Sequence, residues 1–200
     1  MRGLRVQAKQ MVLAALLVVG VLGPAWAVDS AASFVQNVGD QAVQTLKADV
    51  PGPERSSRFR TLLDRSFAMG PISDYALGRQ RKNATPEQLA TFRGLFEDYL
   101  VAVYSSQVGN YEGQVVKVTG SQPQADGSVL VSSQIVSPKD NDSTSLTWRV
   151  GSSSAGYRVL DLLVDGTSLL KTQRDQITAT IKSSGFDGLF SIMRNRISQK

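Results

Sequence analysis

The sequence predicts an α+β fold in which helices pack around a curved, four-stranded antiparallel sheet. Residues 29–104 carry apolar side chains at helical spacing, residues 114–164 alternate as strands do, and residues 168–197 return to helical spacing. Turns between successive strands are short, which favours an antiparallel meander. Helices that flank one run of strands on both sides in sequence are typical of this fold class.

An export signal is predicted at residues 1–27. Arg2, Arg5 and Lys9 give a basic start, residues 11–22 are uncharged and apolar, and Ala25-Trp26-Ala27 is a small-x-small cleavage site. The apolar run is shorter than the roughly 20 residues that a membrane span needs. We therefore expect cleavage after Ala27 and a single soluble exported domain at residues 28–200.

Composition excludes several classes of function. Three of the 22 Lys and Arg residues and none of the 17 acidic residues lie in the signal, which leaves a net charge of +2 for residues 28–200. A nucleic-acid partner, which needs a concentrated basic face, is not expected. The chain has no Cys and no His. This removes disulfides, thiolate nucleophiles, His-based triads and the usual zinc sites.

The helices are delimited by proline, glycine and capping residues. Pro51-Gly52-Pro53 ends a helix over 29–47, a second helix starts near Pro53 and breaks at Gly70-Pro71, and a short one covers 72–77. Thr85-Pro86-Glu87-Gln88 forms a capping box that opens a long helix. Gly185 separates two closing helices, at 168–184 and 186–197, as a C-cap.

Four strands are expected at 114–119, 128–137, 143–150 and 156–164. The fourth strand carries apolar residues on both faces, so we expect either that helices cover both faces of the sheet or that the sheet curves around an interior. Asp64, Asp74, Asp161 and Asp165 are candidate carboxylates for acid–base work, and Asp161 stands out because it lies among these apolar residues; Tyr157 or Tyr99 could act with it. An isomerase-like enzyme using Asp161 and Tyr157 is therefore an alternative, but no activated pair is visible and we expect no enzyme.

The long helix carries a wide aromatic stripe of Phe92, Phe96, Tyr99 and Tyr104. From spacing alone such a stripe is either ordinary core or the wall of a pocket.

The order of motifs resembles the MlaC family of periplasmic phospholipid-binding proteins, auxiliary components of an ABC lipid transporter, and their hopanoid-associated relatives called HpnM. The resemblance covers nearly the whole of residues 28–200. It is carried by seven segments, namely Arg58 to Leu63 with Phe67, Ile72 to Gly78, Ala84 to Gln88 leading into the aromatic stripe, Tyr111 to Gln114, Tyr157 to Leu169, Gln173-Arg174, and Gly185 to Leu189. The basic run Arg79 to Lys82 stands where the family usually has an aromatic residue.

The resemblance implies a carrier that holds acyl chains in an apolar pocket and shuttles phospholipid between membranes, in support of outer-membrane lipid asymmetry. Implied partners are an inner-membrane ABC lipid transporter with its lipoprotein ring and an outer-membrane acceptor complex. No cofactor is implied besides the lipid cargo, and a hopanoid is the alternative cargo. A third hypothesis is that the protein is a structural or adaptor protein whose core is fully filled by its own side chains. We expect the lining to comprise Phe59, Leu63, Phe67, Ile72, Phe92, Phe96, Tyr99, Val103, Val116, Val118, Val131, Leu146, Trp148, Leu160, Leu162 and Val164.

Overall fold

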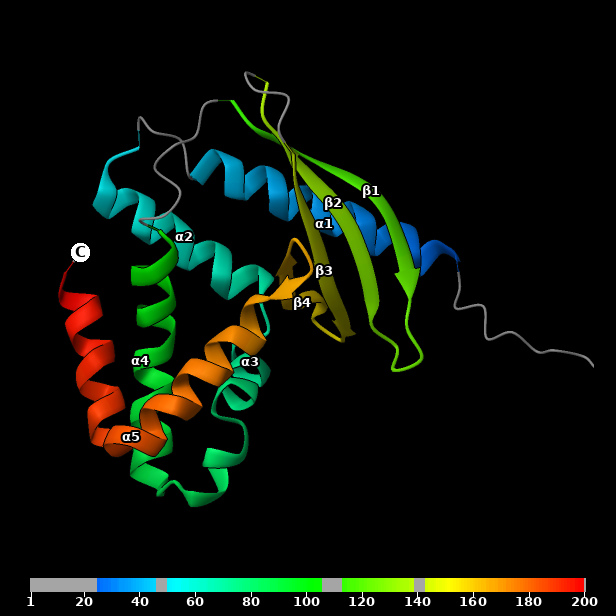
Figure 1. Cartoon of the computed structure of the whole chain (residues 1–200). Coiled ribbons are helices and arrows are strands. Elements are labelled where there is room, and N and C mark those ends of the chain that lie inside the picture. The colour runs from blue at the N-terminus through cyan, green and yellow to red at the C-terminus, as the bar shows by residue number, and fades with distance from the viewer. Residues whose placement is uncertain (1–24, 46–49, 106–112, 139–142, 200) are drawn as a thin grey trace, which may run out of the picture.

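The computed structural model describes residues 25–45, 50–105, 113–138 and 143–199, with side chains from residue 30 onward. In this part of the chain helices and an open antiparallel sheet form an α+β fold, which confirms the predicted class (Figure 1). The elements are α1 (Ala25–Thr45), α2 (Gly52–Ser66), α3 (Met69–Leu77), the 3-10 helix η1 (Gly78–Asn83), α4 (Pro86–Tyr104), β1 (Val115–Pro123), β2 (Val129–Val136), β3 (Ser143–Ser153), β4 (Gly156–Val164), β5 (Thr167–Ser168) and α5 (Leu169–Ser198). The predicted signal up to residue 24, and Tyr111 and Glu112 of the family motif, lie outside the described residues.

The sheet has the strand order β1-β2-β3-β4-β5 and every pairing is antiparallel. The four predicted strands are present, but the prediction of four was one strand short. Asp165 and Gly166 have positive φ angles of 47° and 78°, and they form a tight turn that folds Thr167 and Ser168 back onto the end of β4. The same segment starts α5, because the Ser168 side chain accepts a hydrogen bond from the Lys171 amide at 2.9 Å.

The register between β3 and β4 shifts once, and the shift leaves Leu160 without a cross-strand partner. Arg149 pairs with Asp161, whereas the next residue, Val150, pairs with Val159. Such a bulge bends the strand and re-aims neighbouring side chains. As a result Val159 is fully buried in the core while Leu160 lines a cavity.

Helix α1 lies across one face of the sheet, next to β1 and β2 (Figure 1). Its residues Ala31, Val35 and Val38 pack with Val129 and Val131 of β2 in one buried cluster. Gln36 ties the helix to the sheet, since its Nε2 donates to the Val116 carbonyl at 2.9 Å and its Oε1 accepts from the Val118 amide at 3.2 Å. The opposite face of the sheet exposes Lys117, Ser132, Gln134, Ser145 and Arg149.

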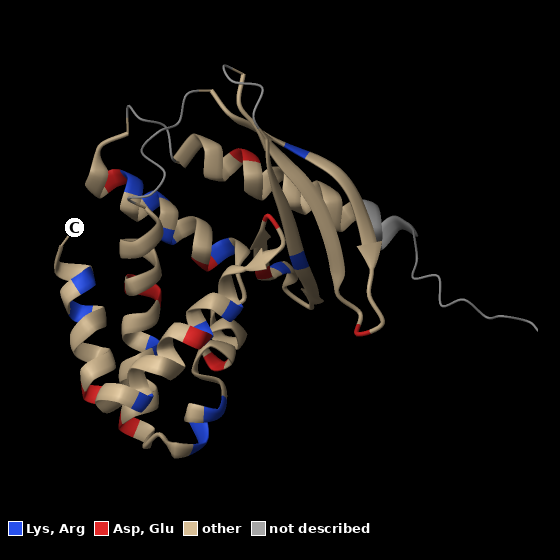
Figure 2. Cartoon of the chain, viewed as in Figure 1, with Lys and Arg blue, Asp and Glu red and all other residues tan. Residues whose placement is uncertain are grey.

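Helices α2 to α5 form a second cluster beside the sheet, built on the buried side chains of α3, α4 and α5. The predicted capping box is confirmed: Thr85 Oγ1 accepts from the Gln88 amide and Gln88 Oε1 accepts from the Thr85 amide. Gly185 has φ 67° and ψ −176°, which bends α5 so that its second half runs beside α4. Charged residues of both signs are distributed over these helices (Figure 2).

The break between α2 and α3 is at Phe67 and Ala68, two residues before the predicted position at Gly70-Pro71. Phe67 forms an isolated parallel bridge with Val159, and the Ala68 amide donates to the Val159 carbonyl at 2.9 Å. A tertiary hydrogen bond to the sheet therefore ends α2, and Gly70-Pro71 falls inside the first turn of α3, where proline is tolerated. This bond joins the helical cluster to the sheet.

Gly39 allows α1 to approach β1 closely, and we expect Gly39→Ala to destabilise the protein. A Cβ at this position would lie 2.8 Å from Val116 Cγ1 and 2.9 Å from Val116 Cβ. The gain in helix propensity is about 1 kcal/mol, whereas overpacking costs about 1–3 kcal/mol. The matched control is Gly94→Ala in α4, where the added methyl group meets no atom of another described element within 4 Å. Urea unfolding should show a lower free energy of unfolding for Gly39→Ala and a higher one for Gly94→Ala; equal shifts would contradict the close approach.

Asp126, in the turn between β1 and β2, has a pKa well below the usual value of an aspartate. The Ser128 hydroxyl and amide, followed by Arg149, lower the pKa of Asp126 to about 2. The unfolded-state pKa is about 3.9. Because the folded-state pKa is the lower one, this group stabilises the fold above about pH 4 and loses that contribution as the pH falls toward 2. The difference in urea midpoint between wild type and Asp126→Asn should therefore shrink between pH 5.5 and 2.5, and a constant difference would be evidence against the shift.

Candidate functional site

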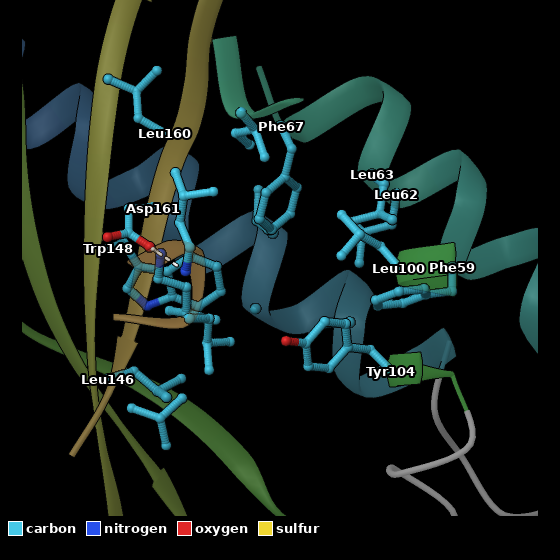
Figure 3. Close-up of a pocket in the computed structure, with 18 of the residues that line it drawn as sticks. Phe59, Leu62, Leu63, Phe67, Leu100, Tyr104, Leu146, Trp148, Leu160 and Asp161 are labelled. Carbon is cyan, nitrogen blue, oxygen red and sulfur yellow. Dashed lines mark hydrogen bonds between the residues drawn. The ribbon is translucent and has the colours of Figure 1, made fainter. Parts of the chain in front are cut away.

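A cavity of about 470 Å³ lies between the sheet and the helices. It is open to solvent on one side, and its wall is formed by the C-terminal part of α1, by α2, α3 and α4, by the sheet and by the start of α5 (Figure 3). Its volume falls in the range of roughly 300–1,000 Å³ that is usual for ligand pockets. It is lined by Val38, Gly39, Ala42, Val43, Phe59, Leu62, Leu63, Phe67, Met69, Ile72, Phe96, Leu100, Tyr104, Gln114, Val116, Ile135, Thr144, Leu146, Trp148, Leu160, Asp161, Leu162, Val164, Leu169, Leu170 and Gln173.

The cavity exists because the core is divided. One buried cluster joins α1 to the sheet, and the other joins α3, α4 and α5. Phe59 and Phe67 pack against both clusters. Elsewhere the two clusters stand apart, and the space between them is walled almost wholly by aliphatic and aromatic side chains. Because hydrophobic contacts do not depend on direction, such a wall is suited to binding a hydrocarbon chain.

Most of the side chains that the sequence predicts as lining do surround this cavity. They come from α2 and the residue that follows it, from α3 and α4, and from the strands β1, β3 and β4, so these elements contribute to one wall. These residues are Phe59, Leu63, Phe67, Ile72, Phe96, Val116, Leu146, Trp148, Leu160, Leu162 and Val164. That they contact a ligand stays a prediction.

The other five predicted residues are placed elsewhere. Phe92 is fully buried in the helical cluster, where its ring stacks on Phe96 at a centroid distance of 5.0 Å. Tyr99 packs on the same cluster, and Val103 is a half-buried neighbour on α4. Val131 is fully buried in the cluster of α1 and the sheet, against which Val118 also packs. The stripe on α4 thus faces α5 as well as the cavity, and α1 covers the part of the sheet around Val131.

Several of the lining residues that the prediction missed come from α1 and from the start of α5. Val38, Ala42 and Val43 continue the apolar stripe of α1, so that stripe was the available signal. Leu169 and Leu170 are the first two residues of α5 and close the cavity beside the end of β4.

Trp148 is the largest side chain in the wall. It is 4% exposed, and its Nε1 donates a buried hydrogen bond to Ser133 Oγ at 2.8 Å. This bond satisfies the indole N–H within the sheet, because Ser133 lies on the adjacent strand β2. The hydrogen bond to Ser133 therefore fixes the position of the indole ring, and apolar atoms of the ring line the cavity.

Asp161 lines the cavity, but its carboxylate is engaged in the fold. Oδ1 accepts from the Leu162 amide at 2.8 Å and from the Leu170 amide at 3.2 Å, and Oδ2 accepts from the Ser168 hydroxyl at 2.6 Å (Figure 3). These bonds attach β4 to the N-terminus of α5, where a negative charge is favourable.

The tyrosines of the isomerase alternative do not complete an acid–base site in the described structure. The Tyr157 ring packs against Phe34 of α1 at a centroid distance of 5.9 Å. Tyr99 lies outside the cavity wall, and burial is the main reason that its pKa is raised. A raised pKa keeps the phenol neutral and makes it a poor base near neutral pH.

None of the described helices combines the length and the hydropathy that a membrane crossing requires. Among the described residues no three acidic side chains gather in a way that would hold a metal ion.

Comparison with known proteins identifies the family. The model of the MlaC protein family matches residues 36–195. Among solved structures, a phospholipid-binding protein from Ralstonia solanacearum, determined in complex with a phospholipid, is similar with a TM-score of 0.68 and 26% sequence identity. The match covers 85% of this chain and 98% of that chain. Since the family model spans most of the chain, from α1 to the last turns of α5, this chain belongs to the MlaC family.

Proposed function

We propose that this protein is a periplasmic lipid carrier that holds acyl chains in the cavity and moves phospholipid between an inner-membrane transporter and an outer-membrane acceptor. The observation that carries the proposal is the cavity itself, an apolar space of about 470 Å³ that side chains leave unfilled. The Ralstonia solanacearum relative, which was solved with a phospholipid, supports the same ligand class. The carrier is exported by the signal at residues 1–27, and residues 28–200 act as one domain.

The physical need for a carrier follows from the cost of hydrating lipid tails. At about 0.8 kcal/mol per methylene, roughly thirty methylenes of a two-chain lipid resist transfer into water by some 20 kcal/mol or more. A dry apolar cavity replaces the membrane as the solvent for these tails. The cargo must also leave again, so part of it, namely the headgroup, stays outside the cavity and keeps the affinity below the non-covalent limit.

A binding role suits the polar groups of the wall better than an enzymatic one. The carboxylate of Asp161 is occupied by three donors of its own chain. The remaining wall supplies contact area without a nucleophile and base within reach of each other. We therefore propose binding and release, without chemical change of the lipid.

Trp148 provides a direct test, because Trp26 is the only other tryptophan and lies in the proposed signal. Protein exported to a periplasm, processed and purified without detergent is titrated with a phospholipid whose acyl chains carry bromine, a contact quencher of indole fluorescence. We expect quenching of Trp148 by the brominated lipid and none by the unbrominated lipid of equal chain length. Absence of quenching at saturating lipid would contradict the proposal.

The identity of the natural cargo is read in a second measurement. Native mass spectrometry of the same preparation separates co-purified phospholipid from co-purified hopanoid by mass. Phospholipid supports the proposed cargo and hopanoid supports the alternative. An empty protein that also fails to bind added lipid points to the third reading, a chain without lipid cargo.

A further inference from the structure

One polar pair interrupts the apolar wall of the cavity. Gln173 of α5 and Tyr104 of α4 both line it, and Gln173 Nε2 donates to the Tyr104 hydroxyl oxygen at 3.1 Å. Gln173 is only 6% exposed. Figure 3 shows Tyr104 with its hydroxyl directed across the cavity toward the sheet, where Trp148 and Leu146 lie.

The other end of the glutamine amide has no partner within the described part of the chain. Gln173 Oε1 is buried and accepts no hydrogen bond from any described residue. More than nine in ten buried polar groups of proteins are satisfied, and a bare carbonyl in an apolar site is costly. The oxygen has almost no accessible surface of its own, but other atoms of Gln173 line the cavity, so a small turn of the side chain brings Oε1 to a donor carried by the occupant.

The pair presents one acceptor and one donor to this occupant. Gln173 Oε1 has its lone pairs free, and Tyr104 uses its oxygen as the acceptor for Nε2, so its hydroxyl hydrogen remains to be donated. A partner that both donates and accepts satisfies the two together. A hydroxyl group does so, whereas an ester carbonyl accepts only and a methylene does neither.

We propose that Gln173 and Tyr104 form a polar subsite that binds a free hydroxyl group on the buried part of the cargo. The proposal rests on the proposed function, since it assigns a chemical preference within the same cavity. The acyl-glycerol region of a diacyl phospholipid offers acceptors only, so it leaves Gln173 Oε1 unpaired. Two kinds of lipid carry the required group: a monoacyl phospholipid with its free glycerol hydroxyl, and a hydroxylated polycyclic lipid.

The test compares lipids that differ in this hydroxyl alone. Protein loaded with brominated diacyl phospholipid is titrated with 1-oleoyl-lysophosphatidylcholine or with its 2-deoxy analogue, below their micelle concentrations, and recovery of Trp148 fluorescence reports displacement. The phosphocholine headgroup has no hydrogen-bond donor, so the glycerol hydroxyl is the only one in the molecule. We expect the hydroxyl lipid to displace about tenfold better. A second experiment compares a sterol with the matching hydrocarbon that lacks its hydroxyl. The lipid pair that shows a preference identifies whether a monoacyl phospholipid or a hydroxylated polycyclic lipid fits the subsite.

Substitutions at Gln173 and Tyr104 test whether these two residues cause the preference for the lipid with a hydroxyl group. Gln173→Leu removes the acceptor and should bring the two members of a lipid pair to equal affinity. Tyr104→Phe removes the donor and should reduce the preference in part. Gln176→Leu, an exposed position on the same helix, should leave the preference unchanged. Thermal melts of the lipid-free proteins check folding, and Gln173→Met replaces Gln173→Leu if the latter fails to fold.

The outcomes separate the two proposals. Equal displacement by both members in both arms overturns the subsite, as does a preference that survives both Gln173→Leu and Tyr104→Phe. Failure of the brominated phospholipid to quench Trp148 at the start overturns the carrier function itself. A preference in either arm that disappears in Gln173→Leu supports the subsite.

Discussion

Leu146→Trp is expected to lower the affinity for phospholipid roughly a hundredfold while the protein stays folded. Leu146 is on β3 with its side chain in the cavity wall, so a larger side chain grows into the empty space instead of into packed neighbours. Displacing about four methylenes of cargo at about 0.8 kcal/mol each costs roughly 3 kcal/mol, and each 1.4 kcal/mol is a factor of ten. Lipid phosphate per protein after detergent-free purification measures the loss.

The neighbouring residue gives the matched control. Ser145 lies on the same strand but on the exposed face of the sheet, so Ser145→Trp adds the same side chain outside the cavity and should retain wild-type lipid. Val131→Trp gives a contrast, because Val131 is fully buried under α1 and a larger side chain there should unfold the protein. Circular dichroism distinguishes these cases. A folded Leu146→Trp protein with undiminished lipid would show that the cavity is not the binding site.

Asp161→Ala is expected to lower the free energy of unfolding by about 1–2 kcal/mol, because it leaves partly buried donors without their acceptor. The lost bonds come from the amides of Leu162 and Leu170 and from the Ser168 hydroxyl, so the start of α5 is released from β4. The negative charge that favours a helix N-terminus is lost as well.

Asp161→Asn is the control, since it keeps the size and one acceptor oxygen and should cost about 1 kcal/mol. Chemical unfolding of both variants in parallel with wild type measures the series. Leu169 and Leu170 line the cavity directly after this junction, so the alanine variant should also retain less lipid. An alanine variant as stable as wild type would show that Asp161 does not hold the junction.

The sequence predicted the strands well because alternation and turn residues are local signals. Cavity residues were harder to predict, as α4 illustrates. Phe92 and Phe96 lie four residues apart on one stripe, and both are buried, but Phe96 alone reaches the cavity. A helix that packs against both α5 and an open space shows one continuous apolar stripe. Periodicity reports burial, and it does not distinguish a side chain that meets protein from one that faces a void.

Features that depend on long-range contacts were missed for a related reason. The end of α2 is set by the hydrogen bond between Ala68 and Val159, which are 91 positions apart in the printed sequence. Val131 and Leu146 share the inner face of the sheet, yet α1 covers Val131 and leaves Leu146 open. The docking of a helix on the sheet decides which strand residues it covers. The sequence of the strand itself therefore does not show which of its residues are covered.

The division of the core gives the cargo a thermodynamic role. Since the two buried clusters share Phe59 and Phe67 and are otherwise separated by the cavity, bound tails act as the missing middle of the hydrophobic interior. Ligand present at a hundred times its dissociation constant stabilises a protein by about 2.7 kcal/mol. Loading and conformational stability are therefore coupled, and a carrier that delivers its lipid gives up part of its own stability at the moment of transfer.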